Sequence, residues 1–524
     1  MAGTSKILLF VVGLLCLSSA QVYSQKLSIK LADNFFDEYK FSEAINLYEY
    51  CYQRDTANQY VVRRLAEANR NMGNSEADER WLKHIITSQT KDPVDIFNYA
   101  QALRSNGKYL LAEKWLKQYS LLKPDDSRIV LQESTWEYVQ SLMKDSANYK
   151  VFNTSINTKG SDMGPTFYKG RLIFSSTARA QYSIANEHAN EMPNLDMYSA
   201  LISPYGDLSS VDPFAPKLRT LFHDGPASID EKNGIIYFTR NNIVKNKILR
   251  SKNGVVNLQI FEGKLENGEW NLKGSLSINS DEYSVVHPSI SRNGKILFFA
   301  SDMPGGFGGM DIYYCVSTNG KWGSPINLGS QINTKGNELF PFISNDDVLY
   351  FASDGHGGIG GLDIFSAIER ESVFTEVKNL GFPINSSKDD FGLALDSTGV
   401  KGYFVSNRNG GKGDDDIYFM KIKRTPIHVT GVVKDIDTGN TLSDATISVI
   451  NENEVTILNS QSQSSGQFNL EINKGLQYRI VVNKESYIPK KIILSTGRIR
   501  INGEASVEIF MKQKTFPQGA SGSK

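Results

Sequence analysis

The chain has 524 residues, and its 57 Lys and Arg residues balance 57 Asp and Glu residues, so its formal net charge is zero. This length predicts several domains, and the balanced charge argues against a nucleic-acid partner, which normally leaves a basic footprint. Aromatic residues make up 11% of the chain and glycines number 43, a composition typical of a β-rich protein with many turns.

The first 24 residues have the pattern of an export signal. Lys6 supplies the positive charge, and residues 7–17 form an apolar stretch too short to span a bilayer comfortably. Small residues follow, so we expect a signal peptide over residues 1–24, with an uncleaved membrane anchor as the alternative. Cys16 follows Leu15, where a lipobox has a small residue, and lipidation is therefore not expected.

The cysteines agree with export to a bacterial envelope. After the predicted signal peptide only Cys51 and Cys315 remain, in different predicted domains, so we expect no disulfide framework. No later stretch of the sequence has the apolar length of a membrane helix. These features favour a periplasmic location.

Residues 25–145 have helical periodicity. Small or apolar residues recur at i, i+4 and i+7 around Ala44, and the pattern returns near Ala77 and Ala112. Pro124 follows at a point where the last helix should end. The pattern predicts about three helical repeats.

These alanines resemble those of the tetratricopeptide repeat. The family has a small residue in its first helix, here Ala32 and Ala100, and Ala at the start of its second helix. The resemblance implies a curved array whose concave face commonly binds peptides. The alternative is a helical cap that only packs against the next domain.

Residues 150–424 repeat a short phrase. Ser-Asp or Ser-Asn, a Gly-rich turn, and Asp-Ile before an aromatic residue occur over residues 301–313, 353–365 and 406–418. Repeats about 50 residues apart predict a β-propeller. Five units can be counted, and a sixth blade from residues 199–220 is left open. An Ile-Asn-Thr/Ser signal also recurs, followed by a proline that we expect to open a strand, here Pro165, Pro226, Pro288 and Pro341.

The acidic residues of this phrase are predicted to hold turns closed. Gly supplies positive φ, and Asp can accept hydrogen bonds from nearby backbone N–H groups. The alternative is a calcium site, because carboxylates in a Gly-rich loop are suitable ligands. Their spacing is not that of an EF-hand, so we predict no metal site. The acids concerned are Asp302, Asp311, Asp354 and Asp363.

The same segment resembles the WD40-like propeller repeats of TolB-type periplasmic proteins. Its Gly-Gly-x-Gly-Gly-x-Asp-Ile form resembles the subgroup common in envelope proteins of the Bacteroidetes. The motif is specific in the last three units and weak in the second.

Residues 427–512 alternate apolar and polar residues between Gly, Asp and Asn turns. This pattern predicts a small sandwich of about seven strands. The segment resembles the carboxypeptidase regulatory-like domain, a transthyretin-like β-sandwich. Residues 513–524 are predicted to form a flexible tail.

The sequence has no recognisable catalytic motif. The chain has neither a Gly-x-Ser-x-Gly elbow nor a phosphate loop, and a prolyl-oligopeptidase-like enzyme would need a larger second domain. A sialidase-like motif would end in a Trp that is missing here. We therefore predict no enzyme, no catalytic residues and no cofactor, and no binding residue is identified. The six histidines do not pair at metal-ligand spacing: His84, His188, His223, His287, His356 and His428.

The order of the segments is similar to that of a Bacteroidetes envelope family that includes PorE-like proteins of type IX secretion and gliding. The resemblance implies a multidomain α and all-β scaffold in the periplasm, associated with the outer membrane. Its expected partners are envelope proteins, such as a PorP/SprF-like outer-membrane barrel or secretion components. Family members usually end in an OmpA-like domain, which is not seen after Lys512. Either the chain is a truncated version or this member lacks its own wall anchor, and peptidoglycan binding is not expected without that domain. The alternative function is a glycan-binding or carbohydrate-active protein that uses the propeller face.

Overall fold

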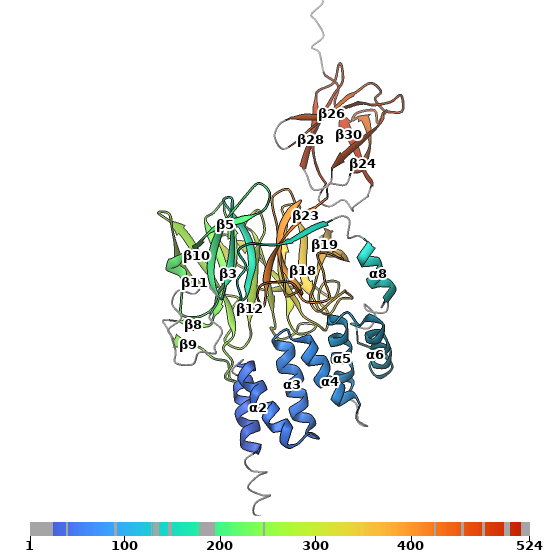
Figure 1. Cartoon of the computed structure of the whole chain (residues 1–524). Coiled ribbons are helices and arrows are strands. Elements are labelled where there is room, and N and C mark those ends of the chain that lie inside the picture. Colours follow the sequence, from blue (N-terminus) through green and yellow to red (C-terminus); the bar gives the residue numbers. More distant parts are fainter. Residues whose placement is uncertain are drawn as a thin grey trace, which may run out of the picture.

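Three parts follow one another along the chain in the computed structural model: helices, a ring of sheets, and a smaller β domain at the far end (Figure 1). The predicted signal peptide, with Cys16, lies outside the described residues, as do His188 and residues 515–524 of the predicted tail. Within the described part of the chain, no helix is both long and apolar enough to cross a membrane. The structure describes residues 25–37, 40–87, 92–126, 128, 136–144, 149–177, 194–244, 247–371, 373–423, 426–451, 455–473, 477–496 and 504–514.

The helical part begins with a helix over residues 25–37, and from α2 to α6 each helix packs against the next. The predicted alanines Ala44, Ala77 and Ala112 are all buried, because their small side chains let neighbouring helices approach closely. Asn58 and Asn74 accept backbone N–H bonds at the starts of α3 and α4. The helices are α2 (Phe41–Arg54), α3 (Gln59–Asn71), α4 (Ser75–Ile86), α5 (Pro93–Ser105), α6 (Tyr109–Leu122) and α8 (Trp136–Lys144).

Five antiparallel sheets form the middle part. Their innermost strands are β2, β6, β12, β17 and β21; each contacts the next, and β21 contacts β2, which closes the ring. Blade 1 is β2 (Asp162–Tyr168), β3 (Arg171–Ser176), β4 (Asp196–Ile202) and β5 (Leu208–Pro213). Blade 2 is β6 (Asp224–Asp230), β7 (Ile235–Asn241), β10 (Leu258–Glu266) and β11 (Glu269–Ser275), and a hairpin of β8 (Ile243–Val244) and β9 (Lys247–Ile248) follows β7.

The remaining blades carry the repeated phrase. Blade 3 is β12 (Val285–Ile290), β13 (Ile296–Ser301), β14 (Asp311–Thr318), β15 (Lys321–Trp322) and β16 (Ile326–Asn327). Blade 4 is β17 (Glu338–Ile343), β18 (Val348–Ser353), β19 (Asp363–Arg370) and β20 (Val373–Asn379). Blade 5 is β21 (Asp390–Leu395), β22 (Lys401–Ser406), β23 (Asp416–Ile422) and β1 (Tyr149–Asn153), which comes before blade 1 in the sequence.

The fold is therefore a β-propeller, and its five sheets correspond to the five units counted in the sequence. Residues 199–220, left open as a sixth blade, form the end of β4, then β5 and a short 3₁₀ helix η2 (Pro216–Leu218). They complete blade 1 and its link to blade 2. The ring closes because β1 pairs with β23, so residues far apart in sequence share one sheet.

The prolines were predicted to open strands, and this was wrong. Pro165, Pro226, Pro288 and Pro341 lie inside the innermost strands, each at a shift in the pairing register. A bulge releases a residue from the ladder, and a proline has no N–H to lose there. The innermost strand of each blade borders the central channel, and a bulge can be accommodated in that strand.

The last part contains two sheets that share one core of buried residues from both. Strands alternate between buried and exposed residues, as in β24, which matches the predicted period of two. One sheet is β24 (Pro426–Asp435), β27 (Gln467–Asn473) and β30 (Glu504–Met511). The other is β25 (Thr446–Ile450), β26 (Thr456–Gln461), β28 (Gln477–Asn483) and β29 (Lys490–Ser495). The more specific resemblances, to tetratricopeptide repeats and to a transthyretin-like domain, stay predictions.

Candidate functional site

The repeated Gly-rich phrase builds turns. Asp311 is the first residue of β14, and its carboxylate accepts from the backbone N–H of Phe307 at 2.6 Å and of Gly308 at 3.2 Å. Asp363 and Asp416 do the same in blades 4 and 5. The predicted turn-holding role is thus confirmed for Asp311 and Asp363. Asp302 and Asp354 accept instead from the backbone N–H groups of Ser284 and Asn337, 18 and 17 residues earlier in the chain. Among the residues that the structure describes, no three His, Cys, Asp or Glu side chains are grouped so as to hold a metal ion.

The asparagine of the Ile-Asn-Thr signal connects the link between two blades to the preceding blade. We call its pair of hydrogen bonds a clasp. The side chain of Asn333 bonds both backbone groups of Ile312: its amide donates to the carbonyl at 2.9 Å, and its oxygen accepts from the N–H at 2.8 Å. Asn385 clasps Ile364 in the same way, at 2.9 and 2.8 Å. Each asparagine therefore ties the link that follows a blade back to that blade's third strand.

The next residue of the same signal holds the following blade. The backbone N–H and the hydroxyl of Thr334 both donate to the carboxylate of Glu338 at 2.8 Å, and Ser353 donates to it at 2.6 Å. Burial raises the pKa of Glu338 to about 7. The same arrangement, with an acid four residues after a hydroxyl, recurs as Thr158–Asp162, Thr220–Asp224 and Ser386–Asp390.

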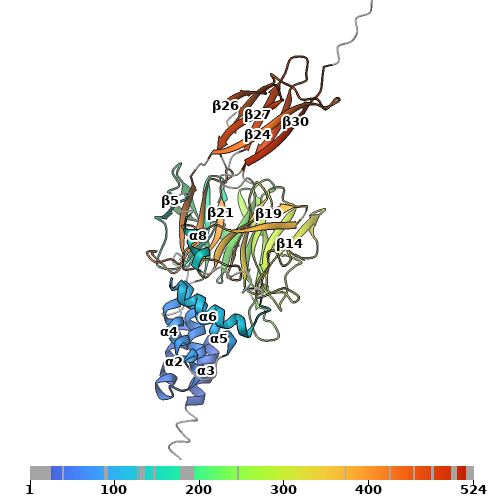
Figure 2. The ribbon, with the colours of Figure 1, turned by 90° about the vertical axis from the view of Figure 1, so that its right-hand side faces the viewer.

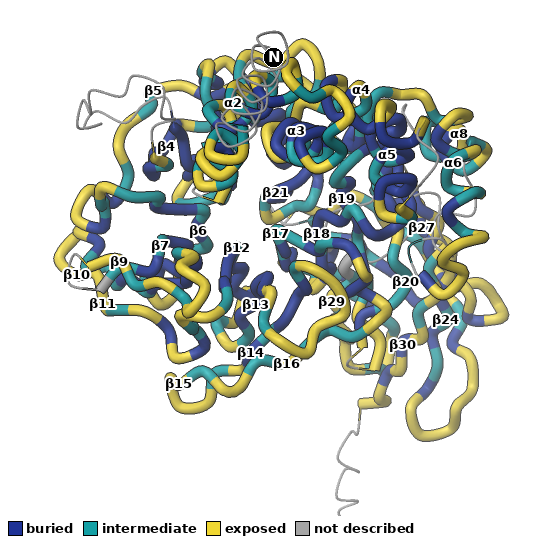
Figure 3. Tube along the Cα trace, turned by 90° about the horizontal axis from the view of Figure 1, so that it is seen from below, coloured by how far each residue is buried: buried dark blue, intermediate teal, exposed yellow. Residues whose placement is uncertain are grey.

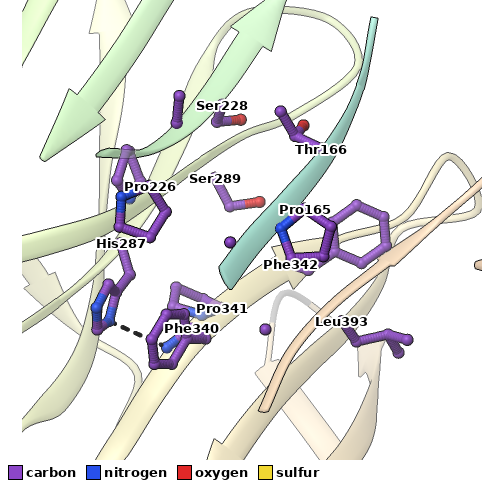
Figure 4. Close-up of a pocket in the computed structure, with 14 residues that line it drawn as sticks. Pro165, Thr166, Pro226, Ser228, His287, Ser289, Phe340, Pro341, Phe342 and Leu393 are labelled. Atoms are coloured by element: carbon purple, nitrogen blue, oxygen red, sulfur yellow. Dashed lines mark hydrogen bonds between the residues drawn. The ribbon is translucent and has the colours of Figure 1, made fainter. Parts of the chain in front are cut away.

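The centre of the propeller is filled by side chains (Figure 4). His287 and Phe340 stack face to face with ring centroids 3.6 Å apart, and the Phe391 ring lies 4.7 Å from that of Phe340. The remaining cavity has a volume of about 50 Å³, and its 14 lining residues include no Asp or Glu. Pockets for small ligands are generally about 300 Å³ or larger.

The packing of these rings is accompanied by strained backbone conformations. At the bulge of the innermost strand three blades have Gly at positive φ, but blades 3 and 4 have His287 (φ 54°) and Phe340 (φ 49°). A residue with a Cβ in this region costs roughly 1–2 kcal/mol. Burial lowers the pKa of His287 to about 3, so its ring is neutral and Nδ1 can accept the N–H of Phe340, at 3.4 Å.

Two of the six histidines lie in blades 3 and 4 of the propeller. His287 lies in β12, as described above. His356 lies in the turn after β18, where it is buried and its Nε2 lies 2.8 Å from the carbonyl oxygen of Ile332.

The helices dock on the loops of blades 4 and 5. Figures 2 and 3 show α2 to α6 gathered on one face of the ring. Lys388, in the loop before β21, donates from Nζ to the hydroxyl of Ser75 at the start of α4, at 2.6 Å. The carbonyl of Leu142 in α8 accepts the N–H of Phe382 at 3.1 Å. The array is therefore fixed to the propeller at more than one point.

Arg104 of α5 is the buried centre of this contact. The residue is 5% exposed, and its side-chain Nε has no hydrogen-bond partner among the described atoms. Burial lowers the pKa of Arg104, while the nearby charges of Asp363 and Asp354 act in the opposite direction. Burial raises the pKa of Asp363 to about 7, and Arg104 counteracts that rise. The cation of one domain thus lies in the field of the acids of another.

A polar cleft of about 470 Å³ opens beside this contact. Its walls come from α4, from the turn between α5 and α6, and from loops of blade 5. The lining residues are Glu76, Glu79, Arg80, Lys83, Ser105, Asn106, Lys108, Ser387, Lys388 and Asn409.

The clasps, the central stack and the helix–propeller contact were not predicted from the sequence. Among these features, the clasps left a usable signal. Asn333 and Asn385 each lie 21 residues after the Ile that they clasp, and the acid always follows its hydroxyl by four residues. The contact between Lys388 and Ser75 spans 313 residues and leaves no local pattern.

Comparison with known proteins gives neither a matching family model nor a matching curated protein. Among solved structures, TolB from Acinetobacter baumannii is 14% identical with a TM-score of 0.28, over 58% of this chain and only 57% of TolB. An exo-β-1,3-galactanase from Clostridium thermocellum is 11% identical with a TM-score of 0.32, over 66% of this chain and 92% of the galactanase. A protein of unknown function from Dyadobacter fermentans is 11% identical with a TM-score of 0.31, over 53% of this chain and all of that protein. Likeness at this level identifies no activity and no partner.

Proposed function

We propose that the protein is a non-enzymatic scaffold of the bacterial envelope, periplasmic and associated with the outer membrane, that binds protein partners. The observation that carries the proposal is the contrast between the two cavities. The propeller centre has a cavity of about 50 Å³ beside stacked aromatic rings, whereas the cleft between helices and propeller has a volume of about 470 Å³. Of these two spaces, the cleft between the domains is the one large enough for a segment of a partner.

The hydrogen bonds that the acids of the propeller repeats already form support the same proposal. Asp311 and Asp363 hold turns through backbone N–H groups, and Glu338 holds a link between blades. Carboxylates committed to such bonds are poorly placed to act as the acid and base of a glycosidase. The propeller is then a rigid platform that carries the helices and the C-terminal β domain.

The sequence resemblance suggests the partners. A PorE-like family of type IX secretion and gliding predicts an outer-membrane barrel of the PorP/SprF kind, or secretion components. The alternative, a glycan-binding or carbohydrate-active protein, would be favoured by acids and aromatic residues at one mouth of the channel. The lining of the central cavity has aromatic rings but no acid.

Crosslinking of the full chain in native membranes, followed by mass spectrometry, tests the proposal. We expect an outer-membrane barrel or secretion component to be enriched, with crosslinks to lysines of the helices or of blade 5. Capture of no such protein, together with binding on a glycan array, would overturn the scaffold proposal in favour of the carbohydrate alternative.

A further inference from the structure

The cleft between the helices and blade 5 has an excess of positive charge. Four of its lining residues are cations and two are acids. One acid is already neutralised, because Glu79 accepts from Lys108 Nζ at 2.7 Å and also from the Asn106 amide at 2.8 Å. The cations Arg80, Lys83 and Lys388 form no ion pair with the carboxylates that the structure describes.

Lys388 is the most constrained of these cations. It is partly buried, and the acceptors of its Nζ are neutral: the hydroxyl of Ser75 at 2.6 Å and the side-chain oxygen of Asn106 at 3.5 Å. A partly buried ammonium with only neutral acceptors favours an anion in its vicinity, because the screening by water is reduced there. The ammonium is also held in place by groups from the other domain.

The cations of the cleft come from two different domains. Arg80 and Lys83 lie on α4, whereas Lys388 lies on a loop of the propeller. Neutral side chains that can donate and accept hydrogen bonds line the space between them, among them Ser105, Ser387 and Asn409. A single phosphate would need converging donors, whereas a peptide offers separated carboxylates and a backbone that bonds to neutral groups.

We propose that this cleft binds a short acidic segment of a partner protein. The volume of about 470 Å³ is within the range of about 300–1,000 Å³ that is usual for ligand pockets. The proposal rests on the scaffold function and specifies which surface recognises the partner and by what chemistry. Since both walls contribute, binding also requires that the helices stay docked on the propeller.

The test is fluorescence anisotropy of the full mature chain with a labelled acetylated peptide of alternating Glu and Ser, against a twin with Gln in place of Glu. The variant is Arg80→Glu with Lys83→Glu, on the exposed side of α4. The matched control is Lys114→Glu with Lys117→Glu, two exposed lysines at the same i, i+3 spacing on α6 and outside the cleft. Circular dichroism melts verify that both variants fold.

We expect the Glu peptide to bind at least about tenfold more tightly than the Gln peptide, and the α4 variant to lose about tenfold in affinity while the α6 control changes by less than about twofold. Equal binding of the two peptides, or equal losses in the two variants, would overturn the proposal. So would displacement of the peptide by inorganic phosphate in preference to chloride at the same ionic strength.

Partner capture from membranes separates this proposal from the scaffold function. If the α4 variant captures the outer-membrane partner as well as the unmodified chain does, the scaffold function stands and the acidic-segment site is wrong. If the unmodified chain captures no partner, the scaffold function fails, and the peptide titration still decides whether the cleft binds acidic segments.

Discussion

The imidazole of His287 stacks on the ring of Phe340 at the centre of the propeller, with the two planes inclined by 15°. Both residues have positive φ, and the equivalent residues of the other three blades, Gly164, Gly225 and Gly392, do too. Two blades thus accept backbone strain in order to place aromatic rings on the axis. The rings leave a central cavity of only about 50 Å³.

This relationship predicts an unusual order of stability at position 287. His287→Gly and His287→Ala remove the same ring interaction, but only Ala keeps a Cβ at positive φ. We expect the Gly variant to be more stable than the Ala variant by about 1 kcal/mol, the reverse of the usual order within a strand. Urea unfolding of both variants measures the difference. As a control, Ser289 of the same strand does not have positive φ, and Ala should be the more stable variant there. An Ala variant that is the more stable at both positions would contradict the strain argument.

The clasp between blades 4 and 5 predicts the effect of Asn385→Ala. Asn385 is fully buried, and its loss leaves the N–H and the carbonyl of Ile364 without that partner, as well as the side-chain oxygen of Asn379. We expect the free energy of unfolding to fall by roughly 2–4 kcal/mol, because buried polar groups lose their bonds. Asn409→Ala, at an exposed position of the next blade, is the control and should change stability by less than about 0.5 kcal/mol. Equal stability of the two variants would show that the clasp is dispensable.

These clasps also indicate which features of the structure could be predicted from the sequence. The repeated phrase predicted the propeller and the role of Asp311 in a turn, because both depend on residues close together in the chain. It placed Pro288 wrongly at the start of a strand, since the position of a bulge depends on the channel that five blades create together. The contact of Lys388 with Ser75, and with it the cleft, depends on how two domains dock. Nothing in the local pattern of either segment carries that information.

The docking of the helices predicts the effect of Arg104→Met. Methionine keeps much of the buried side-chain volume but removes the cation that lies in the field of Asp363 and Asp354. Removing one member of a buried set of charges leaves the others uncompensated, so we expect the helices to separate from the propeller more often. Hydrogen exchange should show about tenfold lower protection in α5 and α6, with β24 and β27 of the C-terminal domain unchanged.

A matched control for this experiment is Lys114→Met, which removes an exposed cation from α6. It should leave the exchange rates of α5 unchanged. Equal protection of α5 in the Arg104 variant and in the unmodified chain would mean that the contact through Lys388 and Leu142 alone holds the array.

The buried carboxyl of Glu338 predicts how stability depends on pH. Its pKa of about 7 in the folded chain lies above the value of about 4.3 for an unfolded Glu. Between these values the folded state holds a proton that the unfolded state has released, so the free energy of unfolding falls as pH rises from about 4 to about 7. Above that range the contribution of this group becomes constant. Glu338→Gln keeps the shape and an acceptor for Thr334, and it removes the titration.

We therefore expect urea unfolding between about pH 5 and pH 7.5 to show a smaller loss of stability in Glu338→Gln than in the unmodified chain, by roughly 1–3 kcal/mol over the whole range. Some dependence should remain, because burial raises the pKa of Asp363 to about 7 as well. Glu371→Gln, at an exposed position of the same blade, should leave the slope unchanged. An unaltered slope in the Glu338 variant would mean that this carboxyl is ionised throughout, held by the N–H of Thr334 and the hydroxyl of Ser353.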